Sequence, residues 1–119
     1  MTRYFQTLGA FSALIAVVAG AISAHGSPLG VGVIETGARY EMYHALALLI
    51  LGFLEPRGLL RAAGYFFLAG TILFSGSLYA IGATGWPDFG FITPFGGAFF
   101  VLGWAFFGLG LAKMRKEKE

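Results

Sequence analysis

Tyr4 to Ala24 reads YFQTLGAFSALIAVVAGAISA, a run of 21 residues without one charged side chain. An α-helix rises about 1.5 Å per residue and needs about 20 apolar residues to cross a hydrocarbon layer of ~30 Å. The run is long enough for this, and it exceeds the roughly 7 to 15 apolar residues of a signal peptide. We therefore expect a retained membrane-spanning helix at residues 4–24.

Three further stretches extend this interpretation. Uncharged runs from Ala62 to Gly85 and from Phe89 to Ala112 are each long enough to cross a bilayer. The run from Met42 to Leu54 has only 13 residues, so the second span has to include Arg39 and Glu41. The sequence predicts a single domain, residues 1–119, with spans at about 4–24, 38–54, 62–84 and 91–112.

The composition agrees with a lipid environment. Hydrophobic residues make up 57% of the 119 residues and charged residues only 12%, against roughly 25% charged in a soluble domain. The absence of Cys excludes disulfide bonds, thiolate metal sites and lipidated cysteines. The predicted fold class is all-α, an integral membrane four-helix bundle.

Basic residues are divided unequally between the two ends of such a bundle. The end with both termini carries seven of them: Arg3, Arg57, Arg61, Lys113, Arg115, Lys116 and Lys118. The other end carries Arg39 alone. Because basic residues near span ends stay on the cytoplasmic side, both termini are predicted to be cytoplasmic. The basic tail directly follows an apolar helix, so we interpret it as an orientation signal and expect no nucleic-acid partner.

Small residues recur every seven positions in the predicted spans. The fourth span has Gly96, Gly103 and Gly110, and the third has Gly70 and Ser77. The same spacing occurs at Gly9, Ala16 and Ser23, at Ala38, Ala45 and Gly52, and at Ala63 and Thr84. A seven-residue period keeps one face toward a partner helix, and small residues let two backbones approach closely. We predict that these residues lie at helix contacts.

Polar residues gather in the half of the predicted spans away from the termini. They are His25, Arg39, Tyr40, Glu41, His44, Ser75, Ser77, Tyr79 and Thr93. On a helix, Tyr40, Glu41 and His44 share one sector, which puts Glu41 in position to accept a hydrogen bond from His44. Three interpretations stay open for this candidate polar cluster: hydrogen bonds between helices, a ligand or proton site, and a metal or haem site.

The sequence contains no pattern that indicates an enzyme. It has no recognisable nucleophile–base–orienter trio, phosphate-binding loop or pair of catalytic carboxylates. Neither His follows the two-His spacing of a helical metal site. We expect no catalytic residue, no metal and no cofactor.

Several segments, in order along nearly the whole chain, resemble one family. They are Ala24-His25-Gly26, Thr36-Gly37 with Arg39 to Leu48, FSGSLY at residues 74–79, TPFGG at residues 93–97, and Gly103-Trp104. They look like the domain-of-unknown-function family 423 of small bacterial inner-membrane proteins, which is similar to human transmembrane protein 256. The resemblance implies a compact four-helix, multi-pass protein of the bacterial inner (cytoplasmic) membrane with no established activity. The family usually has Gln where this chain has Glu41.

Two functions in different classes fit these observations. The first is a non-enzymatic accessory or self-associating membrane component that the polar cluster holds together. Its partners would be the lipid bilayer and either a second copy of the chain or another membrane protein. The alternative is a small transporter or ligand-binding membrane protein that uses the polar cluster as its site.

Overall fold

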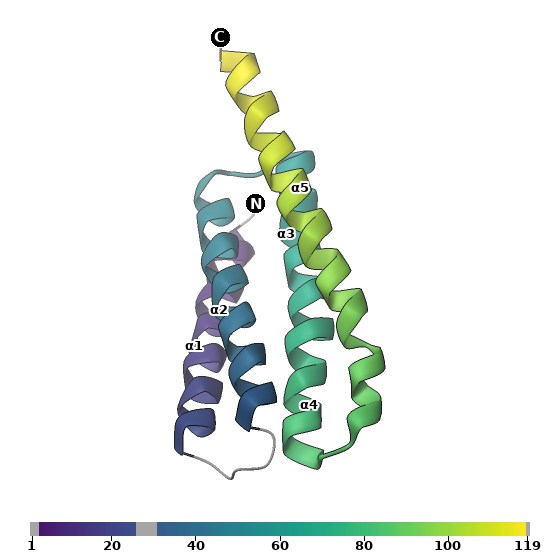
Figure 1. Cartoon of the computed structure of the whole chain (residues 1–119). Helices are drawn as coiled ribbons and strands as arrows, with labels where there is room; N and C mark the ends of the chain where they lie inside the picture. Colours follow the sequence, from purple (N-terminus) through teal and green to yellow (C-terminus); the bar gives the residue numbers. More distant parts are fainter. Residues whose placement is uncertain (1–2, 26–30, 119) are drawn as a thin grey trace.

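The computed structural model describes residues 3–25 and 31–118, and within them every regular element is helical. The elements are α1 (Arg3–His25), α2 (Val31–Phe53), α3 (Leu59–Gly70), the π-helix η1 (Thr71–Ser75), α4 (Gly76–Thr84), the 3-10 helix η2 (Pro87–Phe91) and α5 (Thr93–Lys118). Because α3, η1 and α4 follow one another without a break, they form one long rod (Figure 1). The chain therefore has four long helical segments, and the all-α prediction is confirmed.

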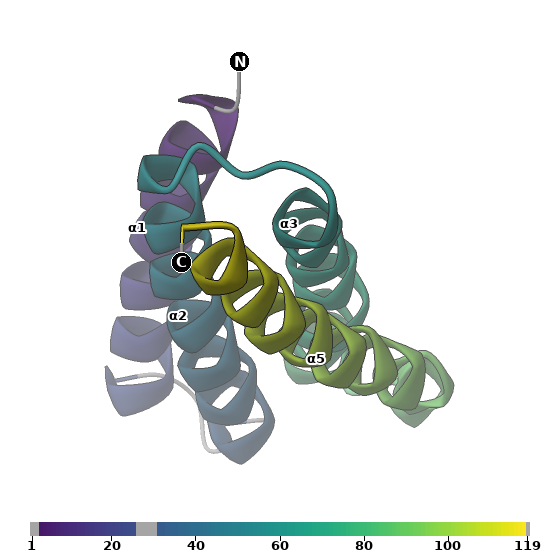
Figure 2. The same ribbon diagram turned by 90° about the horizontal axis from the view of Figure 1, so that it is seen from above.

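The four segments are arranged as two antiparallel pairs. Helix α1 packs along α2, and α3 packs along α5 (Figures 1 and 2). Helix α2 also contacts η1 and α4, so it joins the two pairs. The N- and C-termini lie toward the same end of the bundle, together with the connection from α2 to α3 (Figure 1). We call this the terminal end.

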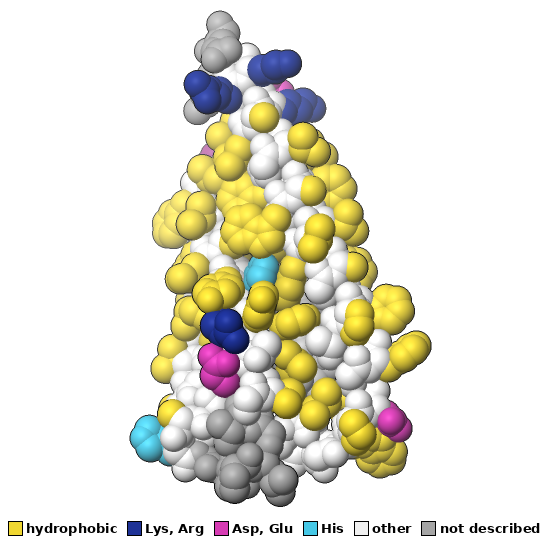
Figure 3. Space-filling model, in the orientation of Figure 1, with side chains coloured by type: hydrophobic (Ala, Val, Ile, Leu, Met, Phe, Trp, Pro, Cys, Tyr) yellow, Lys and Arg dark blue, Asp and Glu magenta, His cyan; other side chains and the backbone are white. Residues whose placement is uncertain are grey.

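The surface between the two ends is apolar. Large hydrophobic side chains are exposed on every long helix, among them Phe11 and Val17 on α1, Ile50 on α2, Ile72 on η1 and Val101 on α5. On the face shown in Figure 3, hydrophobic side chains are spread along most of the length of the molecule, and basic side chains gather near the C-terminus. Three helical segments are long and apolar enough to cross a membrane: 4–25, 59–84 and 87–117. An apolar surface of this extent is suited to lipid, and the chain is an integral membrane protein.

Helix α2 begins at Val31, seven residues before the start predicted for the second span. Two interactions favour helix in this first part. The Thr36 hydroxyl donates to the carbonyl of Gly32, and Glu35 and Arg39 form an ion pair one turn apart. The earlier start changes the position of the polar residues, because Glu41 lies about 15 Å and His44 about 20 Å along the helix from Val31. Both lie near the middle of α2, whereas the sequence placed them toward its outer end.

Small residues occupy the contacts between helices. Gly9, Ala16 and Ser23 of α1 are buried, as are Ala38, Ala45 and Gly52 of α2, Ala63 of α3, Gly70 and Ser77 of the long rod, and Gly96, Gly103 and Gly110 of α5. Thr84 is exposed. A Cβ atom added at Gly103 would lie 2.6 Å from the Phe67 ring. The helices can therefore pack this closely only where a side chain is absent or very small.

The aromatic core lies toward the terminal end. Phe5, Leu51 and Phe67 are almost completely buried, and Phe100 and Phe107 pack around them. Toward the other end, polar side chains replace aromatic ones between the helices, and the candidate site lies there.

Candidate functional site

Glu41 joins three helices through its carboxylate. Its side chain is only 4% exposed. Oε2 accepts a hydrogen bond from the Ser12 hydroxyl of α1 at 2.8 Å, and Oε1 accepts one from the Tyr79 hydroxyl of α4 at 2.7 Å. Buried polar groups are costly unless they are hydrogen-bonded, so each of these three side chains stabilises the position of the other two.

His44 has a separate set of partners. Its ring stacks on Phe100 with centroids 3.6 Å apart and planes 8° from parallel. Nε2 accepts a hydrogen bond from the Trp104 indole at 3.0 Å, and Nδ1 lies 2.6 Å from the carbonyl oxygen of Tyr40. An indole only donates and a carbonyl only accepts, so this arrangement selects the neutral tautomer with its proton on Nδ1.

The expected contact between Glu41 and His44 is therefore wrong. The two residues share a helix, but Glu41 bonds to α1 and α4, whereas His44 bonds to α5 and to the backbone of its own helix. A helical spacing of three puts two side chains in the same sector. It does not decide which of the surrounding helices offers the better partner.

Two hydroxyl groups of the long rod connect it to neighbouring helices. The Ser75 side chain is fully buried, and its hydroxyl donates to the carbonyl of Gly37 in α2 at 2.7 Å. Ser77 and Thr93 are linked through their hydroxyls at 2.5 Å, which connects α4 to the start of α5. Each hydrogen bond therefore joins two different helices.

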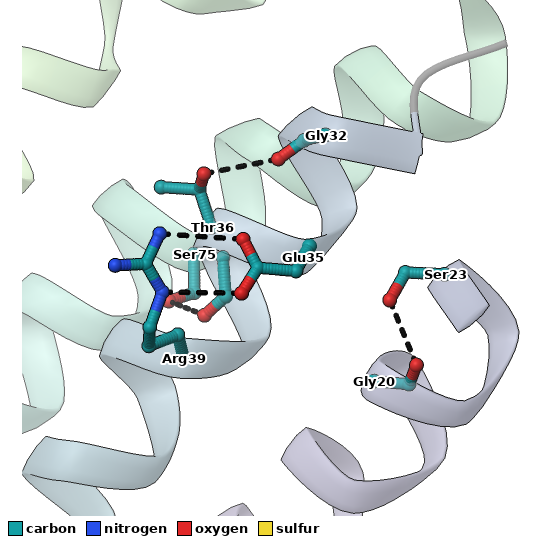
Figure 4. Close-up of polar contacts among 8 residues, drawn as sticks. Gly20, Ser23, Gly32, Glu35, Thr36, Arg39 and Ser75 are labelled. Carbon is teal, nitrogen blue, oxygen red and sulfur yellow. Dashed lines mark hydrogen bonds and ion pairs between the residues drawn. The ribbon is translucent and has the colours of Figure 1, made fainter.

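The remaining predicted residues lie outside this network. His25 is exposed at the end of α1, where Nδ1 lies 3.1 Å from the carbonyl oxygen of Ala21. Arg39 is exposed and pairs with Glu35 through two hydrogen bonds of 3.2 Å, as Figure 4 shows. The Tyr40 ring packs against Phe74 at a centroid distance of 4.9 Å. The predicted cluster is thus divided into an interhelical network and an exposed group.

Sequence reasoning missed two members of the network. Ser12 lies in the middle of an apolar run. A single hydroxyl group among apolar side chains was the feature of the sequence that could have indicated a polar contact there. Trp104 lies two turns beyond Gly97 on the fourth span and is 48% exposed, and its indole donor needs a partner where the surroundings are apolar. We define the interhelical network as Ser12, Glu41, His44, Ser75, Ser77, Tyr79, Thr93 and Trp104.

The interhelical network leaves few hydrogen-bonding groups free to bind a ligand. In the described parts of the chain, every buried side-chain nitrogen and oxygen has a hydrogen-bond partner within the protein. Those parts also contain no group of three or more His, Asp or Glu side chains that could hold a metal. A groove of about 500 Å³ between α1 and α2 is lined by Arg39 but not by Glu41, His44 or Tyr79. A second cavity lies at the terminal end.

Comparison with known proteins places the chain in a family. A family model described as "Protein of unknown function (DUF423)" matches residues 19–97, which include the resemblance segments from Ala24-His25 to TPFGG. The chain belongs to the DUF423 family. The predicted family is thereby confirmed, while the likeness to human transmembrane protein 256 stays a prediction.

Relatives that match the chain include bacterial membrane proteins. The chain is 41% identical to the UPF0382 membrane protein YwdK of Bacillus subtilis over 111 residues, which cover 86% of this chain and 90% of the relative. It is 33% identical to the UPF0382 inner membrane protein YgdD of Escherichia coli over 124 aligned positions, which cover 98% of this chain and 95% of the relative. No solved structure matches the chain. This DUF423 member is a multi-pass protein of the inner membrane, and the family's activity is unknown.

Proposed function

We propose that this chain is a non-enzymatic, self-associating component of the membrane, in which the interhelical network serves stability. The observation that carries the proposal is that the buried polar atoms of the described residues are all paired within the protein. A binding or proton-transfer site needs donors or acceptors that remain available to its ligand. The carboxylate of Glu41 has both oxygens engaged by hydroxyl groups, and His44 has both ring nitrogens engaged.

The rival function, a small transporter or ligand-binding protein, has weaker support. Its site would have to use the polar residues of the predicted cluster, yet the groove between α1 and α2 reaches only Arg39 among them. That groove is lined mainly by small residues, among them Ala16, Gly20, Ala24 and Ala38. A surface of this kind is better suited to close contact with another helix than to a polar solute.

The Glu35–Arg39 pair supports a second copy of the chain as the partner. The side chains of Arg39 and Glu35 are 46% and 51% exposed, and they border the small-residue groove of α1 and α2 (Figure 4). Charged side chains are costly beside lipid. In a twofold dimer each surface meets its own copy, so Arg39 of one subunit would face Glu35 of the other. One contact would then cover both the groove and the ion pair.

The oligomeric state of charge variants tests this proposal. Glu35→Arg places two like charges on the contact, so we expect fewer cross-linked dimers in native membranes. The double variant Glu35→Arg/Arg39→Glu restores opposite charges and should restore the dimer. Because the chain has no Cys, a single cysteine at Ala24 can report the contact through a short bismaleimide, and one at the exposed Ile72 serves as the control.

Three results would contradict the proposal. The first is a protein that remains monomeric in membranes at every concentration. The second is equal cross-linking at Ala24 and Ile72, which indicates random collision. The third is specific binding of a small solute that is lost in Tyr79→Phe, which would favour the rival function.

A further inference from the structure

The terminal end of the bundle contains a large open cavity, which we call the terminal basin. Its volume is about 1580 Å³. It lies among the first turn of α1, the end of α2 with the following loop, the start of α3 and the last turns of α5, and its lining includes Gln6, Arg57, Arg61, Lys113 and Met114. In Figure 2 the loop from α2 to α3 and the end of α5 are seen on this side of the molecule. None of the network residues lines the basin, so the proposed function does not account for it.

The backbone around the basin has a defined shape. Glu55 and Gly58 both have positive φ, 51° and 57°, and Pro56 between them is buried. Proline fixes its own φ, and at a residue with a Cβ atom, such as Glu55, a positive φ persists only where the surroundings require it. Gly52 packs against Gln6, where an added Cβ would lie 2.5 Å from the Gln6 side chain. The walls are therefore held in place before any ligand arrives.

The charges in the basin favour an anion. Arg57, Arg61 and Lys113 line it, against Glu55 and Glu117. The hydroxyls of Tyr4 and Tyr65 lie beside the Arg61 guanidinium. A guanidinium has five N–H donors, and its planar fork matches the oxygens of a phosphate.

Apolar side chains lie beside these charges. Phe53, Leu60 and Met114 also line the basin, and Phe53 is 72% exposed. The basin lies where the helices leave the apolar part of the molecule. Basic pockets at this level between membrane helices suit lipid headgroups, because the phosphate meets the cations while the chains stay in the bilayer. A free phosphate in water would gain nothing from the apolar walls.

We propose that the terminal basin binds the phosphate of an anionic phospholipid, with Arg61 and Lys113 as its principal contacts. Arg57 contributes positive charge at the loop, and the apolar wall accepts the glycerol and the first part of the acyl chains. The site needs neither self-association nor the interhelical network.

Titration of the purified protein with phosphatidylglycerol, followed by native mass spectrometry, tests the proposal. We expect one bound lipid at low lipid concentration and a clear preference over phosphatidylcholine. Lys113→Gln should weaken the apparent affinity about fivefold, as expected for a cation at a membrane surface. Lys116→Gln is the matched control, because it removes the same charge from the same helix end but does not line the basin. Arg61→Gln should act like Lys113→Gln.

Acidic residues and a soluble ligand provide the remaining comparisons. Glu117→Gln removes a negative charge from the basin wall and should tighten binding, which loss of folding cannot imitate. Glycerol phosphate in excess should not displace the lipid. If it does, the site is one for a free phosphate and the lipid proposal is overturned. Equal weakening by Lys116→Gln and Lys113→Gln, or no preference between the two lipids, would also overturn it.

Discussion

At the scale of single residues, the interhelical network depends on how hydroxyl groups and one indole are matched to acceptors. Glu41 can accept several hydrogen bonds, and two hydroxyl donors reach it from different helices. The sequence indicates that Glu41 and His44 need partners, because ionisable residues within membrane spans usually face the protein interior. It does not indicate which partners they find, since Ser12 and Trp104 lie far from them in the chain. Only the helix arrangement brings these side chains together.

Replacing Glu41 by Leu should therefore destabilise the protein. Leu removes both acceptors and leaves the half-buried hydroxyls of Ser12 and Tyr79 without their partner. We expect a loss of about 1–3 kcal/mol in the free energy of unfolding, measured by thermal unfolding in detergent. Glu41→Gln should lose much less, because the amide can accept from one hydroxyl and donate to the other. A Leu variant as stable as the parent protein would contradict the structural role of this residue.

At the scale of helices, the seven-residue spacing of small residues predicts which faces pack. Gly96, Gly103 and Gly110 all lie at the contact of α5 with the long rod. The limits of α2 are harder to predict, since Glu35, Arg39, Glu41 and His44 lower its apolar character. In the structure these polar residues are shielded by neighbouring helices: Glu41 is buried against α1 and α4, and His44 is buried against Phe100 of α5. A single sequence carries no direct signal for such shielding.

A glycine pair on α5 tests this packing. A Cβ at Gly103 would lie 2.6 Å from the Phe67 ring, whereas a Cβ at Gly108 meets nothing within 4 Å. Gly103→Ala should therefore destabilise the protein by roughly 1–3 kcal/mol through overpacking. Gly108→Ala should leave it unchanged or slightly more stable, because Ala favours helix over Gly. Equal melting temperatures for the two variants in detergent would show that Gly103 does not lie at a close contact.

At the scale of the whole molecule, the division of charge predicts how the bundle is oriented in the membrane. Both chain ends and the α2–α3 connection lie toward the terminal end (Figure 1), which carries seven of the eight basic residues by sequence. Arg39 is the eighth, and it is paired with Glu35. Asp88 lies in η2, in the connection at the opposite end, and Trp86 donates to its carboxylate at 2.7 Å. The positive-inside rule then predicts a cytoplasmic terminal end.

Reporter fusions measure this orientation. A reporter that works only in the cytoplasm should be active when it is fused after Lys113, and one that works only outside should be active when it is inserted beside Asp88. Replacing Lys113, Arg115 and Lys116 by Gln still leaves four basic residues against one, so the orientation should persist. Adding basic residues around Asp88 in that variant balances the two ends, and part of the population should then invert. Because the rule depends on the difference in charge between the ends, a graded response is expected from these two steps. Two results would show that charge does not orient this bundle: an inverted parent protein, or an orientation that stays the same after both sets of substitutions.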